Sequence, residues 1–190
     1  MGALHLTLAS ASPRRRELLA RLGLEPDAIS PADIDETPHA GELPHDYAMR
    51  MGSQKALAVF ATGHVLAGDT VVAAGRRILP KTETESEARA CLELLSGRRH
   101  RVLTSVVLRG PEGEMRTRLS DNIVRFKPLS SEEIAAYLAG GEWRGKAGGY
   151  AIQGAAEGLI QWLRGSHSGV MGLPLFETRA LLKAAGFPLA

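Results

Sequence analysis

Apolar positions along the chain alternate between a strand-like period of two and a helix-like period of 3.6. Residues 4–8 have the apolar and β-branched character of a strand, and the leucines within residues 18–22 share one face of a helix. Ser12 suits the N-cap of that helix, Pro13 its first position, and Gly23 a left-handed C-terminal stop. The pattern therefore predicts a strand that leads directly into a helix.

The rest of the chain mixes strands and helices without an internal repeat. Strand patterns occur at residues 26–30, 64–74, 78–79, 100–108, 115–126 and 159–163, and helix patterns at residues 45–61, 83–95, 130–138 and 175–185. A polar loop with three prolines spans residues 31–44, and a glycine-rich loop spans residues 140–154. We expect an α/β or α+β class, as one domain or as two small lobes that share a core.

Composition narrows the class of protein. The chain of 190 residues is 44% hydrophobic and 23% charged, which is ordinary for a soluble globular protein. A net charge of +2 without a basic run argues against a nucleic-acid partner. One cysteine, Cys91, excludes an internal disulfide, and no stretch approaches the roughly 18 apolar residues of a membrane span. The N-terminus lacks the basic flank of a signal peptide, so we expect a cytoplasmic location and no membrane partner.

The first helix carries positive charge at the end where the helix dipole disfavours it. Arg14 and Arg15 take its second and third positions, where a capping box would place Glu or Gln. A cation there is unfavourable by roughly 0.3–1 kcal/mol. Two interpretations stay open. Both arginines are solvated, or an anion such as phosphate binds the free N–H groups between the two guanidinium groups.

Asp69 is the second candidate, because small and apolar residues surround it in the sequence AGDTVVAA, on a strand expected to be internal. A buried ionised carboxylate is unfavourable unless it meets a cation or several donors. Gly68 leaves room for a ligand, and Thr70 offers a hydroxyl to the opposite face or to the same cleft. The alternative is a β-turn that contains Gly-Asp between two short strands.

Three acidic residues, Asp33, Asp35 and Glu36, lie in the proline-bounded loop. Such residues are usually solvated loop charges. If the loop folds against Asp69, Glu36 and Asp69 would form an oxygen-rich site for Mg²⁺ or Mn²⁺. This divalent metal would lower the pKa of a bound water, and Asp69 would act as the base for that water.

Three lysines have small or turn-forming neighbours: Lys55 follows Gly-Ser-Gln, Lys81 follows a proline, and Lys146 lies in the sequence GKAGGY. Each alone is an ordinary solvated side chain. Together with Arg14 and Arg15, they are enough cations to neutralise a triphosphate.

Two apparent motifs fail on their details. Residues 140–146 begin like a P-loop, but Ala147 replaces the Ser or Thr that would hold magnesium, and a helix rather than a strand precedes them. Residues 165–169 resemble a nucleophile elbow only in composition, because His167 occupies the serine position. We expect residues 165–169 to form a loop.

Five ordered motifs resemble those of the Maf family of nucleoside triphosphate pyrophosphatases: SASPRRRELL, DIDETP, AGDTVV, GKAGGYAIQG and GVMGLPL. The resemblance implies an α/β fold of the Maf and ITPase type, with a mixed twisted sheet and a deep central cleft. It implies a single domain over residues 1–190, with two lobes around that cleft, that often forms a homodimer. It also implies metal-dependent cleavage of a nucleoside triphosphate substrate between the α and β phosphates, giving a monophosphate and diphosphate, on non-ordinary or excess nucleotides.

By position, the resemblance implies that Asp69 accepts a proton and that Glu36 assists Asp69 in holding the divalent metal. The residues that it implies in substrate binding are Ser10, Arg14, Arg15, Lys55, Thr70, Lys81, Lys146 and Gln153. Among these, Arg15, Thr70 and Gln153 help to choose the base or sugar.

The late loop and the strand carboxylate favour the family branch that takes dTTP and UTP. That branch has Arg-Arg after Ser-Pro, Asp-Thr in the strand, and Tyr-x-Ile-Gln-Gly in the late loop, and this sequence matches all three. The branch that takes 7-methyl-GTP typically has Trp, Gln and Glu at positions 14, 70 and 153. The amide of Gln153 has both donors and an acceptor for the O4 and N3 edge of a pyrimidine.

The sequence departs from the family pattern at three positions: Thr82 stands for Pro, Gly145 for Asp, and His167 for Tyr. Two other functions stay open at this point. One is a 7-methyl-GTP pyrophosphatase of the same family, and the other is a non-catalytic nucleotide-binding regulator of septation, since the family has also been linked to cell-division arrest.

Overall fold

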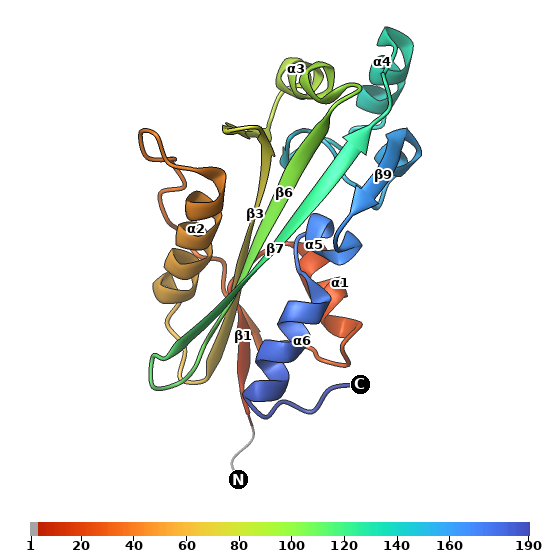
Figure 1. The fold of residues 1–190 in the computed structure, drawn as a ribbon. Helices are drawn as coiled ribbons and strands as arrows, with labels where there is room; N and C mark the ends of the chain where they lie inside the picture. The colour runs from red at the N-terminus through yellow and green to blue at the C-terminus, as the bar shows by residue number, and fades with distance from the viewer. Residues whose placement is uncertain (1–3) are drawn as a thin grey trace.

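The computed structural model describes residues 4–190 as a long mixed sheet with helices on both faces (Figure 1). The strands of the main sheet are β1 (Leu6–Leu8), β2 (Ala28–Ile29), β3 (His64–Ala74), β4 (Arg77–Leu79), β6 (Arg99–Arg109), β7 (Met115–Phe126) and β9 (Ile160–Arg164). Two short strands, β5 (Lys81–Thr82) and β8 (Lys146–Ala147), pair with each other outside this sheet. The helices are α1 (Pro13–Ala20), α2 (Pro44–Ala58), α3 (Glu85–Leu95), α4 (Ser131–Ala139), α5 (His167–Met171) and α6 (Leu175–Ala184), with a 3₁₀ turn at Ala155–Leu159.

Along one edge of β3, the pairing with neighbouring strands is interrupted. The main sheet runs β2-β1-β3-β6-β7-β9, with β1 parallel to its neighbours and the strands from β3 to β9 antiparallel, which confirms the predicted mixed sheet. On one edge β3 pairs with β6 over residues 65–73. On the other edge it pairs with β1 over residues 64–66 and with β4 over residues 72–74. Within residues 4–190, no strand covers residues 67–71 of this second edge, so the sheet has an opening there.

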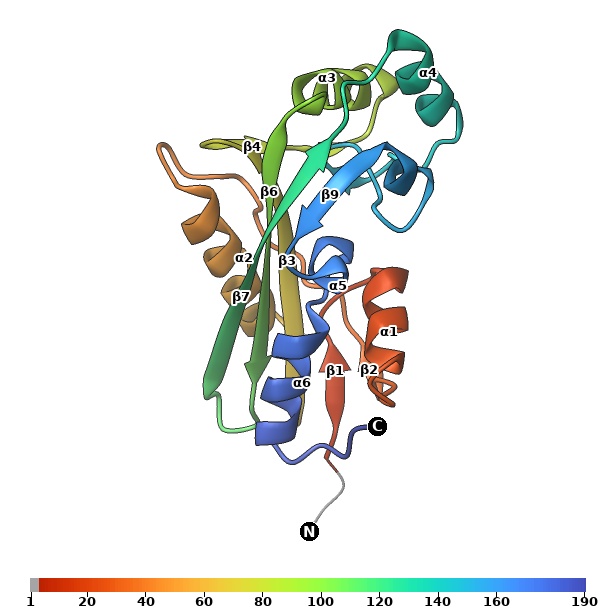
Figure 2. The ribbon, with the colours of Figure 1, turned by 45° about the vertical axis from the view of Figure 1, so that its right-hand side comes forward.

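Helices cover both faces of the sheet, and alternate residues of β3 therefore pack into different hydrophobic cores. Helix α2 lies on one face of β3 and β6, whereas α5 and α6 pack against β6 and β7 on the other face (Figures 1 and 2). Val65, Ala67 and Val71 pack on the α2 side, and Leu66 and Val72 belong to the larger core on the opposite side. This alternation follows from the period of two in a strand.

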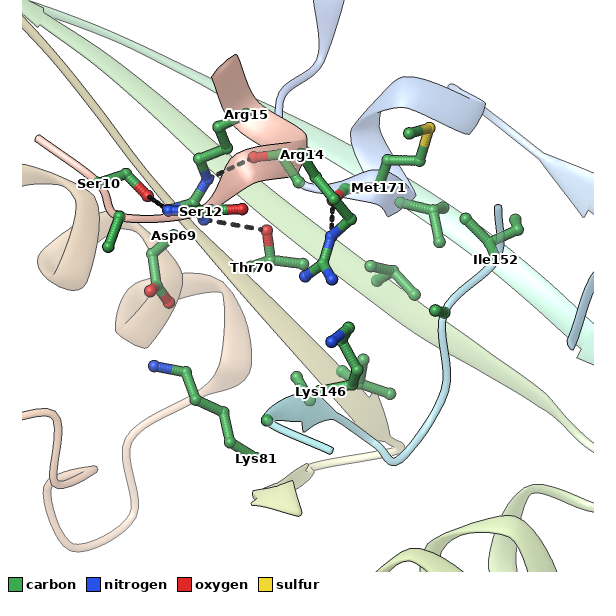
Figure 3. Close-up of a pocket in the computed structure, with 18 of the residues that line it drawn as sticks. Ser10, Ser12, Arg14, Arg15, Asp69, Thr70, Lys81, Lys146, Ile152 and Met171 are labelled. Atoms are coloured by element: carbon green, nitrogen blue, oxygen red, sulfur yellow. Dashed lines mark hydrogen bonds between the residues drawn. The ribbon is translucent and has the colours of Figure 1, made fainter. Parts of the chain in front are cut away.

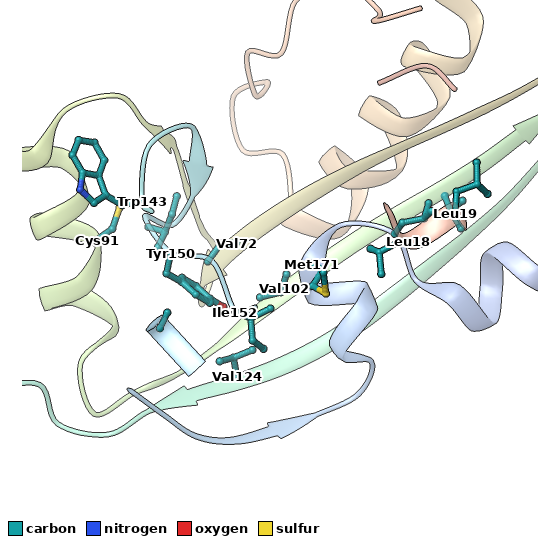
Figure 4. Close-up of a cluster of buried hydrophobic side chains, with 14 of the residues drawn as sticks. Leu18, Leu19, Val72, Cys91, Val102, Val124, Trp143, Tyr150, Ile152 and Met171 are labelled. Atoms are coloured by element: carbon teal, nitrogen blue, oxygen red, sulfur yellow. The ribbon is translucent and has the colours of Figure 1, made fainter. Parts of the chain in front are cut away.

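The larger core ties α1 to the sheet and reaches the far end of the molecule. Leu18 and Leu19 of α1 are fully buried, which stabilises the helix by roughly 1.5–3 kcal/mol for each side chain. Figure 4 shows how this core continues through Val102 and Tyr150 to Trp143, near Cys91 in α3. The division of the chain into two lobes stays a prediction. Among residues 4–190, none of the helices has the length and hydropathy needed to cross a bilayer.

Most predicted elements are confirmed to within a few residues, and α1 has the predicted frame. Pro13 is its first residue, and Gly23 has a φ of +76° after its end. Ser12 occupies the N-cap as predicted, although its side chain makes no capping hydrogen bond. The N–H of Ser12 donates to the Ser10 hydroxyl at 3.2 Å. The predicted capping box of Ser130 is confirmed in α4.

Two predictions about loops are wrong. Residues 165–169, expected as a loop, contain the start of α5, where the Ser166 hydroxyl caps the helix by accepting the N–H of Gly169 at 3.0 Å. The glycine-rich loop of residues 140–154 contains β8. Helical turns of five residues and strands of two residues are too short to show a hydrophobic period, so neither was visible in the pattern.

His100 on β6 is a buried histidine that stays neutral. Its Nε2 lies 2.8 Å from the hydroxyl of Tyr150, and its ring stacks on Phe126 with centroids 5.6 Å apart. Burial lowers the pKa of His100 to about 4, from an ordinary value of about 6.5.

We expect the free energy of unfolding to fall as the pH drops from about 6.5 to about 4, because the unfolded chain then binds a proton that folded His100 does not. The loss attributable to His100 should approach about 3 kcal/mol at the acid end. Urea unfolding across this interval measures the loss. The His100→Gln variant should show a shallower decline, and equal declines in both proteins would contradict the assignment.

Candidate active site

A cavity of about 350 Å³ lies at the opening beside β3 (Figure 3). Its walls come from the β1–α1 connection, the loop after β2, α2, the middle of β3, the β5–β8 pair, the late glycine-rich loop and the end of α5. All the residues predicted to bind metal or substrate line it: Ser10, Arg14, Arg15, Glu36, Lys55, Asp69, Thr70, Lys81, Lys146 and Gln153. The structure thus brings these residues together, while the role of each one stays a prediction.

Asp69 and Thr70 are consecutive residues of β3 that reach this cavity from opposite faces of the sheet. Asp69 points to the α2 side, where it contacts Lys55, and Thr70 points to the α1 and α5 side, where it contacts Arg15. Both line the cavity because no other strand closes the edge of β3 at this level. The alternative of a β-turn at Gly68 and Asp69 is wrong, since both lie within a continuous strand.

A network of ion pairs surrounds Asp69, a residue that is only 4% exposed. The Nζ of Lys55 lies 2.6 Å from Asp69 Oδ1 and 2.8 Å from Glu36 Oε1, and Lys81 pairs with the other oxygen of Glu36. The buried carboxylate therefore meets the cation that burial requires. Lys55 itself is buried, so one ammonium group holds two carboxylates at the floor of the cavity.

The loop after β2 folds against α2 and brings Glu36 into this network. The Tyr47 hydroxyl on α2 donates to the Glu36 carbonyl at 2.6 Å, and burial raises the pKa of Tyr47 to about 12, so the phenol keeps its proton. Burial raises the pKa of the Glu36 carboxyl, but hydrogen bonds from Lys55 and Lys81 outweigh it and lower the pKa overall. Glu36 is therefore ionised at neutral pH.

The other two acidic residues of that loop lie outside the cavity. Asp35 accepts the N–H of Thr37 at 2.8 Å in a local turn, and neither Asp33 nor Asp35 lines the cavity. Of the three loop carboxylates singled out in the sequence, Glu36 alone reaches Asp69 through a shared contact, the ammonium of Lys55.

The donor set suits a metal ion that binds together with phosphate. Glu36 and Asp69 lie on either side of the Lys55 ammonium, so their carboxylates are neighbours, and Mg²⁺ is commonly held by one or two carboxylates with phosphate and water as further ligands. No group of three or more His, Cys, Asp or Glu residues that could hold a metal ion occurs in the described part of the chain. The side chains present therefore fit a divalent cation whose remaining ligands come from the substrate and water.

The two arginines at the start of α1 differ in what their guanidinium groups contact. Arg15 donates from Nε to the Gly172 carbonyl at 2.8 Å, from Nη1 to the Ser10 hydroxyl at 3.0 Å, and from Nη2 to the Thr70 hydroxyl at 3.4 Å. Arg14 donates from Nε to the Met171 carbonyl at 3.4 Å, and its outer nitrogens point toward Lys146 (Figure 3). Arg14 therefore offers free N–H groups to a ligand, whereas Arg15 orients other residues.

Burial and neighbouring charges act on both arginines. Burial lowers the pKa of Arg14 and of Arg15, and the negative charge of Asp69 raises that of Arg15 in opposition. Arginine starts so far above neutrality that both groups keep their charge. Asp69 and Arg15 share the cavity, as the sequence-based interpretation requires.

Two carbonyl acceptors at the end of α5 were not foreseen from the sequence. Met171 and Gly172 hold the arginines through backbone oxygens, which any residue type would supply. The one signal in the sequence is the glycine at position 172. Its φ is +122°, and a Cβ added there would lie 3.4 Å from the Thr70 hydroxyl. A side chain there would be strained and would crowd the contact between Arg15 and Thr70.

The β5–β8 pair sets the positions of two further cations. Lys81 on β5 is paired with Ala147, and Thr82 with Lys146 on β8. Burial lowers the pKa of Lys146, and the nearby charge of Arg14 lowers it further. Both lysines line the same cavity. A negative ligand between Arg14 and Lys146 would relieve the repulsion that Arg14 exerts on the Lys146 ammonium.

Comparison with known proteins gives closely similar relatives. The Maf-like protein family matches residues 5–185. A protein of Novosphingobium aromaticivorans named dTTP/UTP pyrophosphatase is 62% identical over 95% of this chain and 92% of its own length. One of Zymomonas mobilis with the same name is 60% identical over 97% of this chain and 93% of its own length. A crystal structure of a nucleoside-triphosphatase, dITP/XTP pyrophosphatase, from Mycobacterium abscessus covers 96% of this chain and 94% of its own, at 15% identity and a TM-score of 0.44.

Proposed function

The chain belongs to the family of Maf-like proteins, and we propose that it is a nucleoside triphosphate pyrophosphatase that hydrolyses dTTP, UTP and related modified pyrimidine nucleotides. The observation that carries this proposal is the shared cavity in which the carboxylates of Glu36 and Asp69 face the cations of Arg14 and Lys146. The names of the relatives at 60–62% identity support the choice of substrate. We further propose a cytoplasmic homodimer that clears such nucleotides from the pool.

The triphosphate occupies the cationic side of the cavity. The free N–H groups of Arg14 and the ammonium groups of Lys81 and Lys146 bind its oxygens, since charge-assisted hydrogen bonds to phosphate are short and strong. The start of α1 adds a favourable dipole for an anion, which explains the arginine at its second position.

Asp69 activates the attacking water. Its carboxylate orients a water molecule toward the α phosphorus and accepts the proton as the new P–O bond forms. The bond between that phosphorus and the oxygen bridging to the β phosphate breaks, and the diphosphate leaves with the bonding electron pair. Lys55 keeps Asp69 in one orientation by the 2.6 Å ion pair, and the cations around the leaving group stabilise its charge.

Glu36 and Asp69 are the residues that would hold a divalent cation, Mg²⁺ or Mn²⁺. When bound, such an ion supplies charge neutralisation on the phosphates and acidifies water. Lys55, which contacts both carboxylates, keeps them together and limits their mutual repulsion.

The base lies toward the late loop. Gln153 is exposed there and lines the cavity, and its amide can both donate to and accept from the O4 and N3 edge of uracil or thymine. Arg15 places the hydroxyls of Ser10 and Thr70, and thereby shapes the part of the cavity that selects the base or sugar.

We expect purified protein to release diphosphate from dTTP and UTP in the presence of Mg²⁺ or Mn²⁺ and to stop when the metal is chelated, because the carboxylates of Glu36 and Asp69 repel phosphate oxygens unless a cation lies between them. A panel that includes CTP, GTP and 7-methyl-GTP, read by diphosphate release, measures this. A preference for 7-methyl-GTP would contradict the choice of substrate, and absence of diphosphate from every nucleotide would contradict the enzyme itself.

A further inference from the structure

Glu36, one of the two carboxylates proposed to hold the divalent cation, lies in residues 30–43, which contain no helix or strand. Its side chain is held by two ammonium groups: Oε1 lies 2.8 Å from the Nζ of Lys55, and Oε2 pairs with Lys81. Both carboxylate oxygens therefore already face a cation. A metal ion that coordinates either oxygen has to displace an ammonium group, so these ion pairs weaken when the metal binds.

Helix α2 holds the backbone of Glu36 independently of these ion pairs. The Tyr47 hydroxyl donates to the Glu36 carbonyl at 2.6 Å. Arg50 donates from Nη2 to the carbonyl of the next residue, Thr37, at 3.2 Å. Tyr47 and Arg50 are three positions apart on α2, so they share one face of the helix. Both hydrogen bonds use backbone oxygens, and they persist when a metal ion takes the carboxylate.

The Tyr47 side chain is fixed by its own surroundings. It is only 8% exposed, and it belongs to the hydrophobic cluster that includes Met51 of α2 and Val71 of β3. The Arg50 guanidinium lies 5.4 Å from the centre of the Tyr47 ring, and two hydrogen bonds to Glu42, at 2.6 and 2.7 Å, orient it. Packing on both faces of the ring keeps the Tyr47 hydroxyl in one position relative to α2 and to the strand that carries the second carboxylate.

We propose that Tyr47, assisted by Arg50, is a positioning residue for the metal site. Its hydroxyl keeps the Glu36 carboxylate beside Asp69 when a divalent cation displaces the ammonium groups. This inference rests on the proposed function and deepens it. Tyr47 acts through a backbone carbonyl and does not line the 350 Å³ cavity, so it is not a catalytic residue. Its loss weakens the binding of the metal and leaves the chemical step intact.

Replacing Tyr47 with phenylalanine removes the hydroxyl and keeps the ring. The probe is α,β-methylene-UTP, in which a carbon replaces the oxygen between the α and β phosphates, so that binding is measured without turnover. Calorimetry with and without Mn²⁺ gives the gain in affinity that the metal provides. We expect this gain to be about tenfold smaller in Tyr47→Phe than in the wild type, because groups that orient a metal ligand commonly contribute that much to metal affinity.

Kinetics with UTP provide a second measurement that a merely structural role would not produce. The Mn²⁺ concentration that gives half of the maximal rate should rise about tenfold in Tyr47→Phe, while kcat at saturating Mn²⁺ stays within about twofold of the wild type. Tyr137→Phe is the matched control, because the hydroxyl of this buried tyrosine accepts the N–H of Ala151 in the late loop at 3.1 Å and does not contact the segment of Glu36. It should keep the wild-type gain from Mn²⁺.

An unchanged gain from Mn²⁺ in Tyr47→Phe would overturn the inference, and so would a fall in kcat that saturating Mn²⁺ does not restore. If Tyr47→Phe does not fold, Arg50→Met removes the neighbouring contact to Thr37 and should reduce the gain in the same direction. An unchanged gain in that variant would also overturn the inference. A wild-type protein that gains no affinity from Mn²⁺, or that releases no diphosphate from any nucleotide, would instead defeat the proposed function.

Discussion

Replacing Asp69 with asparagine is expected to lower kcat for UTP by about 10²-fold or more, with nucleotide affinity retained. The amide has the same shape as the carboxylate and can still accept from Lys55, so the buried floor of the cavity stays filled. It cannot take a proton from water. Steady-state diphosphate release measures turnover, and titration with UTP in the absence of turnover measures affinity.

Asp33→Asn is the control for Asp69→Asn, because Asp33 belongs to the same chain segment as Glu36 yet lies outside the cavity. It should behave as the wild type. Retention of more than about a tenth of the activity in Asp69→Asn would contradict a role as base. The same variant addresses the idea of a non-catalytic regulator of septation, since such a protein needs the nucleotide site but not the base and would keep its biological effect.

Replacing Lys55 with methionine is expected to lower the free energy of unfolding by about 3–5 kcal/mol and to abolish turnover. Asp69 is buried and has Lys55 as its ion-pair partner, so its charge would be left uncompensated. Glu36 is less affected, because it is partly exposed and keeps Lys81. Urea or thermal unfolding at neutral pH measures the loss.

The double variant Lys55→Met/Asp69→Asn separates charge from packing. With both charges removed, most of the lost stability should return while activity stays absent, because the cost arises from an unpaired buried ion. Lys81→Met is the matched single control. Its ammonium is half exposed, so its loss should change stability by less than about 1 kcal/mol. A double variant as unstable as Lys55→Met would contradict the account of the ion pair.

Hydrophobic periodicity and capping residues were enough to predict the bounds of the long helices and strands. The bounds of β3 and β7 match the predicted ones, because long apolar or alternating runs decide a strand regardless of the surroundings. The frame of α1 is likewise correct, since Pro13 and Gly23 act locally. That frame places Arg14 and Arg15 at the second and third positions of the helix, where their charge is unusual enough to predict an anion site from the sequence.

The remaining features of the site depend on contacts between distant segments. The carbonyls of Met171 and Gly172 hold the two arginines, but every residue type has a backbone carbonyl, so these contacts leave no signal in a sequence. The difference between Arg14 and Arg15 also arises only when α5 packs against α1. Sequence patterns therefore predict the side chains that contact a ligand more readily than the groups that hold these side chains in place.

The opposite orientation of Asp69 and Thr70 separates two properties of the protein that selection can act on. The carboxylate belongs to the ion-pair network on the α2 side, and the threonine contacts Arg15 on the α5 side. Under the proposed function, we therefore expect an exchange at position 70 to change which nucleotides are accepted without displacing the carboxylate of Asp69. Divergence at this one position after gene duplication would give an enzyme that accepts another nucleotide and catalyses the same reaction.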